Sequence, residues 1–260
     1  QWWGETPQGA ESTIKLAKDN GLKVMVKPQL WLSHSWVGEM EFDTEKEWLT
    51  WENDYRKYIM LFAEIAQRTD AEMLCIGTEF KKALKMRDHF WRQLIVEIRE
   101  VYSGLLTYCS NWDEFDSVTI WDAVDVIGVS SYFPLSDEAT PEVDDLASEW
   151  NPIKKRMRAL SKKYNKQILF TEYGYLSVDG CAGKTWELEK NRQQRSVNEK
   201  AQCNALEALY SSFFQEDYWA GGFMWKWYPN GNVRQGFKDH DYTPQGKMAE
   251  KVIQDWYGRF

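Results

Sequence analysis

Two glutamates, Glu79 and Glu172, are the residues best placed to do chemistry, because each stands at the end of a short apolar run. Residues 73–78 lead into Glu79, and residues 168–171 lead into Glu172. Such a run is typical of a strand buried in a parallel sheet, and the carboxyl end of that strand is where α/β barrels hold catalytic groups. Two carboxylates facing one pocket are the groups that hydrolyse glycosidic bonds, so the pattern predicts that chemistry.

The structural alternative for either glutamate is a salt bridge or a helix cap at the end of a strand. Two glutamates in the same context, in a chain with 15 tryptophans, favour catalysis over that alternative. Some tryptophans must lie in the core, because the side chain is bulky and mostly buried. The others suit a cleft in which indole rings stack on flat apolar faces and donate N–H bonds. Sugar rings present such faces.

Six apolar runs alternate with stretches in which apolar residues recur every three or four positions, as strands alternate with helices. The predicted strands span residues 24–30, 73–77, 105–109, 124–129, 167–171 and 221–227. Helices are predicted over residues 9–20 and 145–164, and a further one is capped by Asp88. Two more begin at capping boxes: a long helix at Thr44-x-x-Glu47, and one that runs from Ser196-x-x-Glu199 to about residue 214. The last predicted helix has Pro244 at its first position. Residues 177–195 are polar and predict a surface loop.

Strict alternation implies a parallel sheet, either doubly wound or closed into a barrel. No predicted strand leads into the G-x-G-x-x-G of a nucleotide fold, and Ala182-Gly183-Lys184-Thr185 lacks the first glycine of a phosphate loop because Val178 stands there. Candidate functional residues gather instead at the ends of several strands, which favours a barrel. No linker or repeat interrupts the 260 residues, so we expect one domain.

Composition and charge argue against several classes of function. A net charge of −8 disfavours a nucleic-acid partner, and no apolar stretch reaches the roughly 18 residues of a membrane span. The four cysteines, Cys75, Cys109, Cys181 and Cys203, show no CxxC spacing, which disfavours a zinc site or a disulfide framework. Asp239-His240-Asp241 looks metal-like, but three adjacent side chains rarely converge on one ion. We therefore expect neither a metal nor a cofactor.

Six motifs, in the same order along the chain, carry a resemblance to a known family. They are Lys27-Pro28-Gln29-Leu30-Trp31, Ile76-Gly77-Thr78-Glu79-Phe80, Asn111-Trp112-Asp113, Ser131-Tyr132-Phe133-Pro134, Phe170-Thr171-Glu172-Tyr173-Gly174-Tyr175 and Phe223-Met224-Trp225-Lys226-Trp227. With them the chain resembles clan GH-A glycoside hydrolases and, over nearly its whole length, glycoside hydrolase family 113. The resemblance implies a (β/α)8 TIM barrel, an acid/base glutamate ending strand 4, a nucleophilic glutamate ending strand 7, and mainly β-1,4-mannanase activity.

The spacing of the two glutamates agrees with that implied fold. Glu79 and Glu172 end the second and fifth predicted strands, which are three strands apart, as are strands 4 and 7 of the barrel. We therefore expect the six strands to be strands 3 to 8, with strand 1, helix 1 and strand 2 absent from this chain before residue 1.

The resemblance assigns Glu172 as the nucleophile and Glu79 as the acid/base. It also makes Tyr132 a hydrogen-bond donor to Glu172, and Trp225 a platform for the sugar beside it. The further candidates for substrate binding lie at the ends of predicted strands or in the residues that follow them. They are Gln29, Trp31, His34, Trp36, Thr78, Asn111 and Trp227.

Thr78 departs from the clan, which usually has an asparagine there to bind the sugar 2-hydroxyl. A threonine hydroxyl can donate and accept, but it reaches less far. The structural alternatives are rim packing for Tyr132, a core position for one of Trp225 and Trp227, and an ordinary surface position for His34.

Together these residues predict a retaining endo-β-1,4-mannanase that acts on mannan-type polysaccharide by double displacement. The same groups would serve a β-glycosidase acting on glucan or xylan, and a barrel that binds carbohydrate without turnover is the non-enzyme alternative. Four apparently unpaired cysteines favour a reducing compartment, whereas a polysaccharide-degrading enzyme is more often secreted or periplasmic.

Overall fold

The computed structural model describes residues 3–33, 35–228 and 240–259. Its fold is α/β, with six strands that lie in the sheet in chain order, β1-β2-β3-β4-β5-β6. The pairs β1–β2, β2–β3 and β5–β6 are parallel. Strands that follow one another in chain order are expected for the predicted barrel. In a doubly wound sheet the strand order instead reverses at a switch point.

The chain forms two compact units, Gln1–Gly128 and Val129–Phe260, here called unit 1 and unit 2. The elements of unit 1 are η1 (Trp3–Glu5), α1 (Pro7–Asp19), β1 (Met25–Val26), η2 (Val37–Glu39), α2 (Glu45–Arg68), β2 (Met73–Thr78), α3 (Lys81–Met86), α4 (Asp88–Val101), β3 (Leu105–Asn111) and the start of β4 (Val126–Ser130). Unit 2 continues with α5 (Val143–Tyr164), β5 (Ile168–Tyr173), α6 (Thr185–Asn191), η3 (Arg192–Gln194), α7 (Glu199–Phe213), β6 (Trp219–Met224) and α8 (Met248–Tyr257). The expectation of a single domain stays a prediction.

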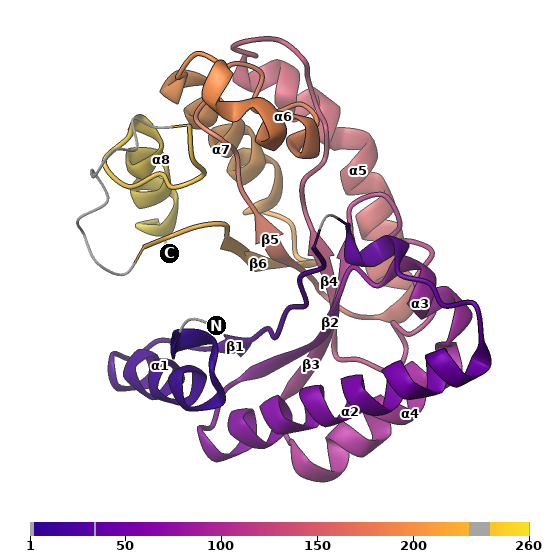
Figure 1. Ribbon diagram of the computed structural model, residues 1–260. Coiled ribbons are helices and arrows are strands. Elements are labelled where there is room, and N and C mark those ends of the chain that lie inside the picture. Colours follow the sequence, from indigo (N-terminus) through magenta and orange to yellow (C-terminus); the bar gives the residue numbers. More distant parts are fainter. Residues whose placement is uncertain (1–2, 34, 229–239, 260) are drawn as a thin grey trace. The chain divides into compact units, whose positions relative to one another are not determined.

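Helix α2 packs against β2, the strand that leads to Glu79, and lies beside α4 (Figure 1). The predicted capping box is confirmed, because Thr44 and Glu47 exchange the two expected hydrogen bonds at the start of α2. Trp51 then stacks on Tyr55 at 5.2 Å between ring centroids. The Tyr55 hydroxyl donates to the carbonyl oxygen of Ile76 at 2.9 Å, so the helix is tied to the backbone of the strand it covers.

An aromatic cluster in unit 2 supports β5, the strand that carries Glu172. Trp150 of α5 and Phe170 of β5 both pack edge-to-face on Phe213 of α7, with ring centroids 5.1 and 4.9 Å apart. All three side chains are buried. Edge-to-face pairs add to the apolar burial energy, so this cluster fixes the strand between its two helices.

Two predictions about strands and loops were wrong in detail. Strand β1 covers only Met25–Val26, whereas 24–30 was predicted, because Pro28 has no N–H to donate to a sheet. Residues 177–195 are not a surface loop. Ser177, Val178 and Ala182 are buried, and α6 lies within the segment. The carbonyl of Ala182 accepts from the N–H of Leu135 at 2.7 Å. Hydrogen bonds between backbone groups therefore allow part of this stretch to be buried, although its polar composition predicts exposure to solvent.

Three predicted helix starts were also wrong. Asn198 rather than Ser196 caps α7, and its side chain accepts from the N–H of Ala201 at 2.9 Å. Asparagine is at least as good a cap as serine. Helix α8 begins at Met248, four residues after Pro244. Asp88 is the first residue of α4 rather than its cap, and its carboxylate pairs with Arg92 instead.

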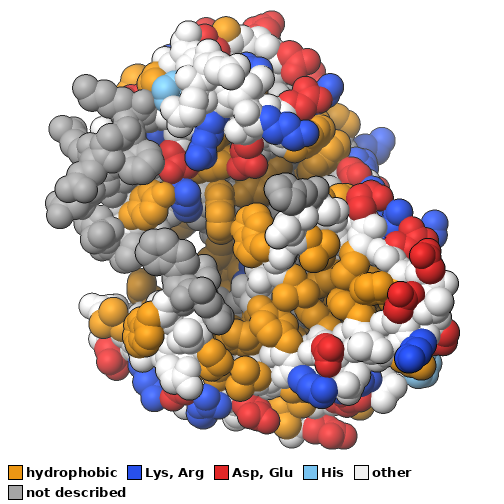
Figure 2. Space-filling view, viewed as in Figure 1, with side chains coloured by type: hydrophobic (Ala, Val, Ile, Leu, Met, Phe, Trp, Pro, Cys, Tyr) orange, Lys and Arg blue, Asp and Glu red, His pale blue; other side chains and the backbone are white. Residues whose placement is uncertain are grey.

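Charged side chains of both signs are interspersed over the viewed surface of each unit (Figure 2). No large basic patch is visible on that face among the described residues. Within the ranges that the structure describes, no helix combines the length and apolar character needed to cross a membrane.

Candidate active site

Glu79 stands where the chain turns from β2 into α3. Its N–H donates to the carbonyl of Cys109 on β3 at 2.7 Å, and its own carbonyl accepts from the N–H of Lys81 at 2.8 Å. The backbone of Glu79 has a φ of +56°. A residue with a side chain pays on the order of 1 kcal/mol for this left-handed conformation, and such backbone conformations cluster at functional sites.

The carboxylate of Glu79 receives a hydrogen bond from an indole. Trp36 Nε1 donates to Glu79 Oε2 at 2.7 Å. Trp36 precedes η2, and its ring lies over Gly38 so closely that a Cβ there would overlap it. The absence of a side chain at Gly38 therefore makes room for the ring that reaches Glu79.

Two other predicted ligands of unit 1 lie beside Glu79 in the chain or on the neighbouring strand. The side chain of Thr78 is buried, with 3% of its surface exposed. Asn111 ends β3, and its Nδ2 donates to Asp113 Oδ1 at 2.9 Å. Asp113 in turn accepts from Lys81 Nζ at 2.6 Å. These bonds join the turn after β3 to the start of α3.

The remaining candidates of unit 1 follow β1. Gln29 is half-buried. Trp31 exposes 77% of its surface and is among the most exposed large apolar side chains of the described chain. His34 lies outside the described residues. The roles given to Gln29 and Trp31 in substrate binding stay predictions.

In unit 2, Glu172 and Tyr132 lie on adjacent segments of the sheet. The N–H of Ser131, just after β4, donates to the carbonyl of Glu172 at 2.7 Å. The hydroxyl of the next residue, Tyr132, donates to Glu172 Oε2 at 3.2 Å. The backbone bond between Ser131 and Glu172 thus places the Tyr132 hydroxyl within hydrogen-bond distance of the Glu172 carboxylate.

Trp225 rests with its backbone against the end of β5. Its N–H donates to the carbonyl of Tyr173 at 2.7 Å. A Cβ at Gly174 would overlap the carbonyl oxygen of Trp225, so this close approach requires glycine. Trp225 is half-buried, and Trp227 exposes 50% of its surface.

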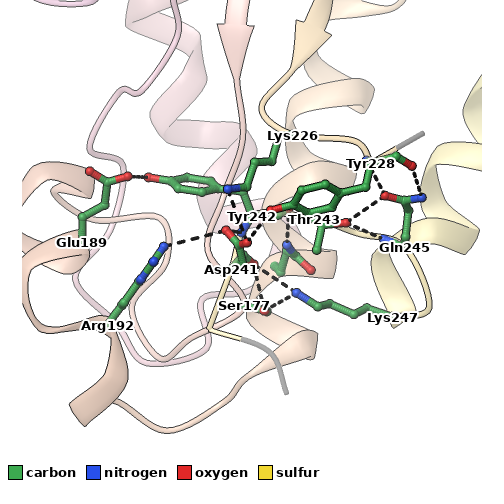
Figure 3. Close-up of polar contacts among 11 residues, drawn as sticks. Ser177, Glu189, Arg192, Lys226, Tyr228, Asp241, Tyr242, Thr243, Gln245 and Lys247 are labelled. Atoms are coloured by element: carbon green, nitrogen blue, oxygen red, sulfur yellow. Dashed lines mark hydrogen bonds and ion pairs between the residues drawn. The ribbon is translucent and has the colours of Figure 1, made fainter. Parts of the chain in front are cut away.

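A polar network centred on Asp241 binds residues 226–228, which follow β6 (Figure 3). Asp241 is 5% exposed. Its Oδ2 lies 3.5 Å from Lys226 Nζ and accepts from the Tyr228 hydroxyl at 3.3 Å, while Arg192 Nη1 lies 3.8 Å from Oδ1. Burial opposes the charge on Lys226, but the Tyr228 hydroxyl and the Asp241 carboxylate outweigh it and raise the pKa of Lys226.

The same network extends toward α8. Lys247 Nζ donates to Ser177 Oγ at 2.7 Å and to the carbonyl of Asp241 at 3.0 Å. Gln245 accepts from the N–H of Tyr228 at 2.7 Å and donates to its carbonyl at 2.9 Å. Residues 226–228 are therefore bound to residues 241–247 through side chains.

The metal-like triplet Asp239-His240-Asp241 falls partly in this region. Asp239 lies outside the described residues, and His240 Nε2 is 2.9 Å from the carbonyl oxygen of Arg195. Among the described residues, no group of three or more His, Cys, Asp or Glu side chains is placed to hold a metal ion.

We expect Asp241→Asn to lower the free energy of unfolding by about 1–3 kcal/mol, the usual cost of disrupting the hydrogen bonds of a buried charged group. Chemical denaturation measures it. Asp255→Asn is the matched control, because Asp255 forms an exposed pair with Lys251, and such a pair contributes about 1 kcal/mol or less. Equal stability of the two variants would show that the network does not stabilise the fold.

Comparisons with known proteins agree with the fold. The profile described as Glycoside Hydrolase Family 113 matches residues 5–247. The chain belongs to glycoside hydrolase family 113. No curated protein sequence matches it significantly.

Three solved structures of family 113 proteins are similar to this chain over most of its length. A GH113 β-1,4-mannanase in a complex has 29% identity and a TM-score of 0.84, with 98% of this chain and 80% of that chain covered. A second structure of a GH113 β-1,4-mannanase has 30% identity, a TM-score of 0.83 and the same coverage. AaManA, a GH113 β-mannanase from Alicyclobacillus acidocaldarius in complex with ManMIm, has 27% identity and a TM-score of 0.84, with 97% and 78% covered.

A more distant likeness concerns the fold alone. A β-glucuronidase from Ruminococcus gnavus has 16% identity and a TM-score of 0.65, with 95% of this chain and 42% of that chain covered. By its family, the chain is a glycoside hydrolase.

Proposed function

We propose that this family 113 glycoside hydrolase is a retaining endo-β-1,4-mannanase in which Glu172 is the nucleophile and Glu79 is the acid/base. The observation that carries the assignment is the same for both residues. Each glutamate stands at the carboxyl end of a strand, and each carboxylate accepts a hydrogen bond from an aromatic side chain, Tyr132 or Trp36. Carboxyl ends of parallel strands are where barrel enzymes hold their catalytic groups.

Double displacement requires opposite protonation states of the two glutamates. In the first step Glu172 attacks the anomeric carbon as a carboxylate, which the Tyr132 hydroxyl orients by donating to Oε2. The bond to the leaving oxygen breaks while Glu79 gives that oxygen its proton. In the second step water attacks the glycosyl ester, Glu79 takes the proton of the water, and Glu172 is released as a carboxylate.

Retention sets a distance for the two carboxyl groups. We expect them to lie about 5–5.5 Å apart, the separation at which one attacks the sugar directly. A crystal structure measures it. A separation of about 6.5–9.5 Å would leave room for a water and indicate inversion instead.

Mannan is the proposed substrate because the solved relatives at 27–30% identity are two β-1,4-mannanases and a β-mannanase. We assign Trp225, Trp227 and Trp31 as stacking platforms, and Gln29, Asn111 and Thr78 as ligands of sugar hydroxyls. We also number the six strands 3 to 8 of a (β/α)8 barrel, which makes β2 and β5 strands 4 and 7. The share of the relatives that the chain covers, 78–80%, agrees with that numbering.

Product analysis on mannohexaose tests the substrate and the mode of cleavage. Endo action releases mannobiose and longer oligosaccharides early in the reaction, whereas release of single mannose units alone would show exo action. Cello- and xylo-hexaose are the comparison substrates, because Thr78 stands where the clan binds the 2-hydroxyl with asparagine. Cleavage of either one without cleavage of mannohexaose would replace the mannan assignment.

We expect Trp36→Phe to move the alkaline limb of the kcat/KM profile to higher pH by about one pH unit. The indole N–H donates to the Glu79 carboxylate, and a donor to the charged form favours ionisation. Without it Glu79 loses its proton less readily, so the acid stays active to higher pH. A hydrogen bond to a charged group contributes roughly 1.5–3 kcal/mol, and one pH unit is about 1.4 kcal/mol. A limb that stays in place would contradict the role given to this bond.

A further inference from the structure

The side chain of Tyr132, which donates to Glu172, packs against a second tyrosine, Tyr242. Tyr132 is half-buried, and its ring meets that of Tyr242 edge-to-face, with the ring centroids 6.3 Å apart. The bond from the Tyr132 hydroxyl to Glu172 Oε2 is 3.2 Å long, whereas most hydrogen bonds between a hydroxyl and an oxygen are about 2.5–3.0 Å long. A small movement of the ring would break a bond of this length, so the bond depends on what holds the ring.

Tyr242 is itself fixed through its backbone and its hydroxyl, and only 3% of its surface is exposed. Its N–H donates to Asp241 Oδ1 at 2.8 Å, and its carbonyl accepts from Gln202 Nε2 on α7 at 3.0 Å. Its hydroxyl donates to Glu189 Oε1 on α6 at 2.8 Å (Figure 3). Burial and then the charge of Glu189 raise the pKa of Tyr242, so the hydroxyl keeps its proton and remains a donor.

The ring of Tyr242 also lies beside the end of β5, the strand that carries Glu172. A Cβ at Gly174 would stand 3.3 Å from Tyr242 Cδ1. Gln202 joins the same two segments, because its Nε2 donates to the carbonyl of Tyr175 at 2.9 Å as well as to that of Tyr242. One buried ring therefore packs on the donor, Tyr132, and lies beside the chain two residues after the carboxylate that accepts from it.

We propose that Tyr242 is a positioning residue, whose ring keeps the Tyr132 hydroxyl on the Glu172 carboxylate and so fixes the orientation in which that carboxylate attacks the sugar. The proposal rests on the role of Glu172 in the proposed function. Attack requires the reacting atoms to be aligned at about 3–3.5 Å. A smaller side chain at position 242 would leave room for Tyr132 to adopt other rotamers, and the carboxylate would lose the donor that orients it.

The test is kcat on mannohexaose for four variants. Tyr132→Phe removes the hydroxyl and should lower kcat on the order of 100-fold, the cost of a slightly misplaced reacting group. Tyr242→Leu leaves the hydroxyl without its support and should cause part of that loss, about 10-fold. In the double variant kcat should be no lower than in Tyr132→Phe alone, because the same bond cannot be lost twice. Tyr242→Phe keeps the ring and should retain the kcat of the wild type.

Tyr218→Leu is the matched control, because Tyr218 is a buried tyrosine of the same unit, 5% exposed. Its carbonyl accepts from the N–H of Ile168, the first residue of β5, so it lies at the opposite end of that strand from Glu172. The control should lose stability and keep the wild-type kcat per folded molecule, with the folded fraction measured by near-ultraviolet circular dichroism.

Equal kcat values for Tyr242→Leu and Tyr218→Leu, or losses that multiply in the double variant, overturn the inference and leave the proposed function intact. Wild-type kcat in Tyr132→Phe overturns it as well. A further measurement does not depend on the folding of Tyr242→Leu. In wild-type protein labelled with ¹³C in its tyrosine rings, NMR is expected to show nuclear Overhauser effects between the rings of Tyr132 and Tyr242, and their absence also overturns the inference. Turnover by Glu172→Gln would instead contradict the proposed function.

Discussion

Glu172→Gln is expected to abolish hydrolysis of mannan, lowering kcat by roughly four to six orders of magnitude, the range found when single members of a catalytic triad are removed. The amide cannot attack the anomeric carbon, so the covalent route is lost. The fold should persist, because the backbone carbonyl of Glu172 still accepts from Ser131 and its strand still packs on the cluster around Phe213.

Two measurements separate loss of chemistry from loss of structure. Calorimetry should detect binding of intact mannohexaose by Glu172→Gln, and its thermal unfolding should differ little from that of wild type. Glu149→Gln, an exposed position on α5, is the matched control and should keep wild-type turnover. Turnover by Glu172→Gln comparable to that control would reject Glu172 as the nucleophile.

Glu79→Ala is expected to lower kcat/KM on mannan by about 10²–10⁴-fold, the usual contribution of general acid–base catalysis. Aryl mannosides with good leaving groups should lose far less in the first step, since they depart without a proton. The glycosyl ester should then accumulate, because no base remains to activate water.

Added azide distinguishes this role from a structural one. Azide needs no general base, so it should restore turnover of the aryl mannoside and yield a β-mannosyl azide that chromatography detects. Glu100→Gln is the control. It should keep wild-type activity on both mannan and the aryl mannoside, and added azide should not change that activity. Equal losses on mannan and aryl mannoside, with no rescue, would argue that Glu79 is not the acid/base.

The strands that carry both glutamates could be predicted because the information is local. Residues 73–77 and 167–171 were predicted, and the structure has strands at Met73–Thr78 and Ile168–Tyr173. Buried parallel strands need continuous apolar runs, and these two runs are uninterrupted. The capping box at Thr44 is local too, since its partner lies three residues away.

The contacts that define the chemical setting of Glu79 could not be predicted in this way. The indole of Trp36 comes from 43 residues upstream, and the pattern indicated only that a tryptophan follows a strand. Glutamate is a residue type that is mostly exposed, and only the packing of the turn after β3 shows that Glu114 is buried. The ion pair between Lys226 and Asp241 likewise joins the end of a predicted strand to a polar segment that hydropathy places in solvent. Long-range packing, rather than residue type, determines all three.

The left-handed backbone at Glu79 has a consequence for attempts to make this enzyme more thermostable. Glycine adopts a φ of +56° without the steric cost that Glu79 pays. A redesign that scores only the folded backbone would therefore favour glycine at position 79, and would remove the proposed acid/base in doing so. Stability and turnover compete at this residue, so it should be held constant in any library selected for heat resistance.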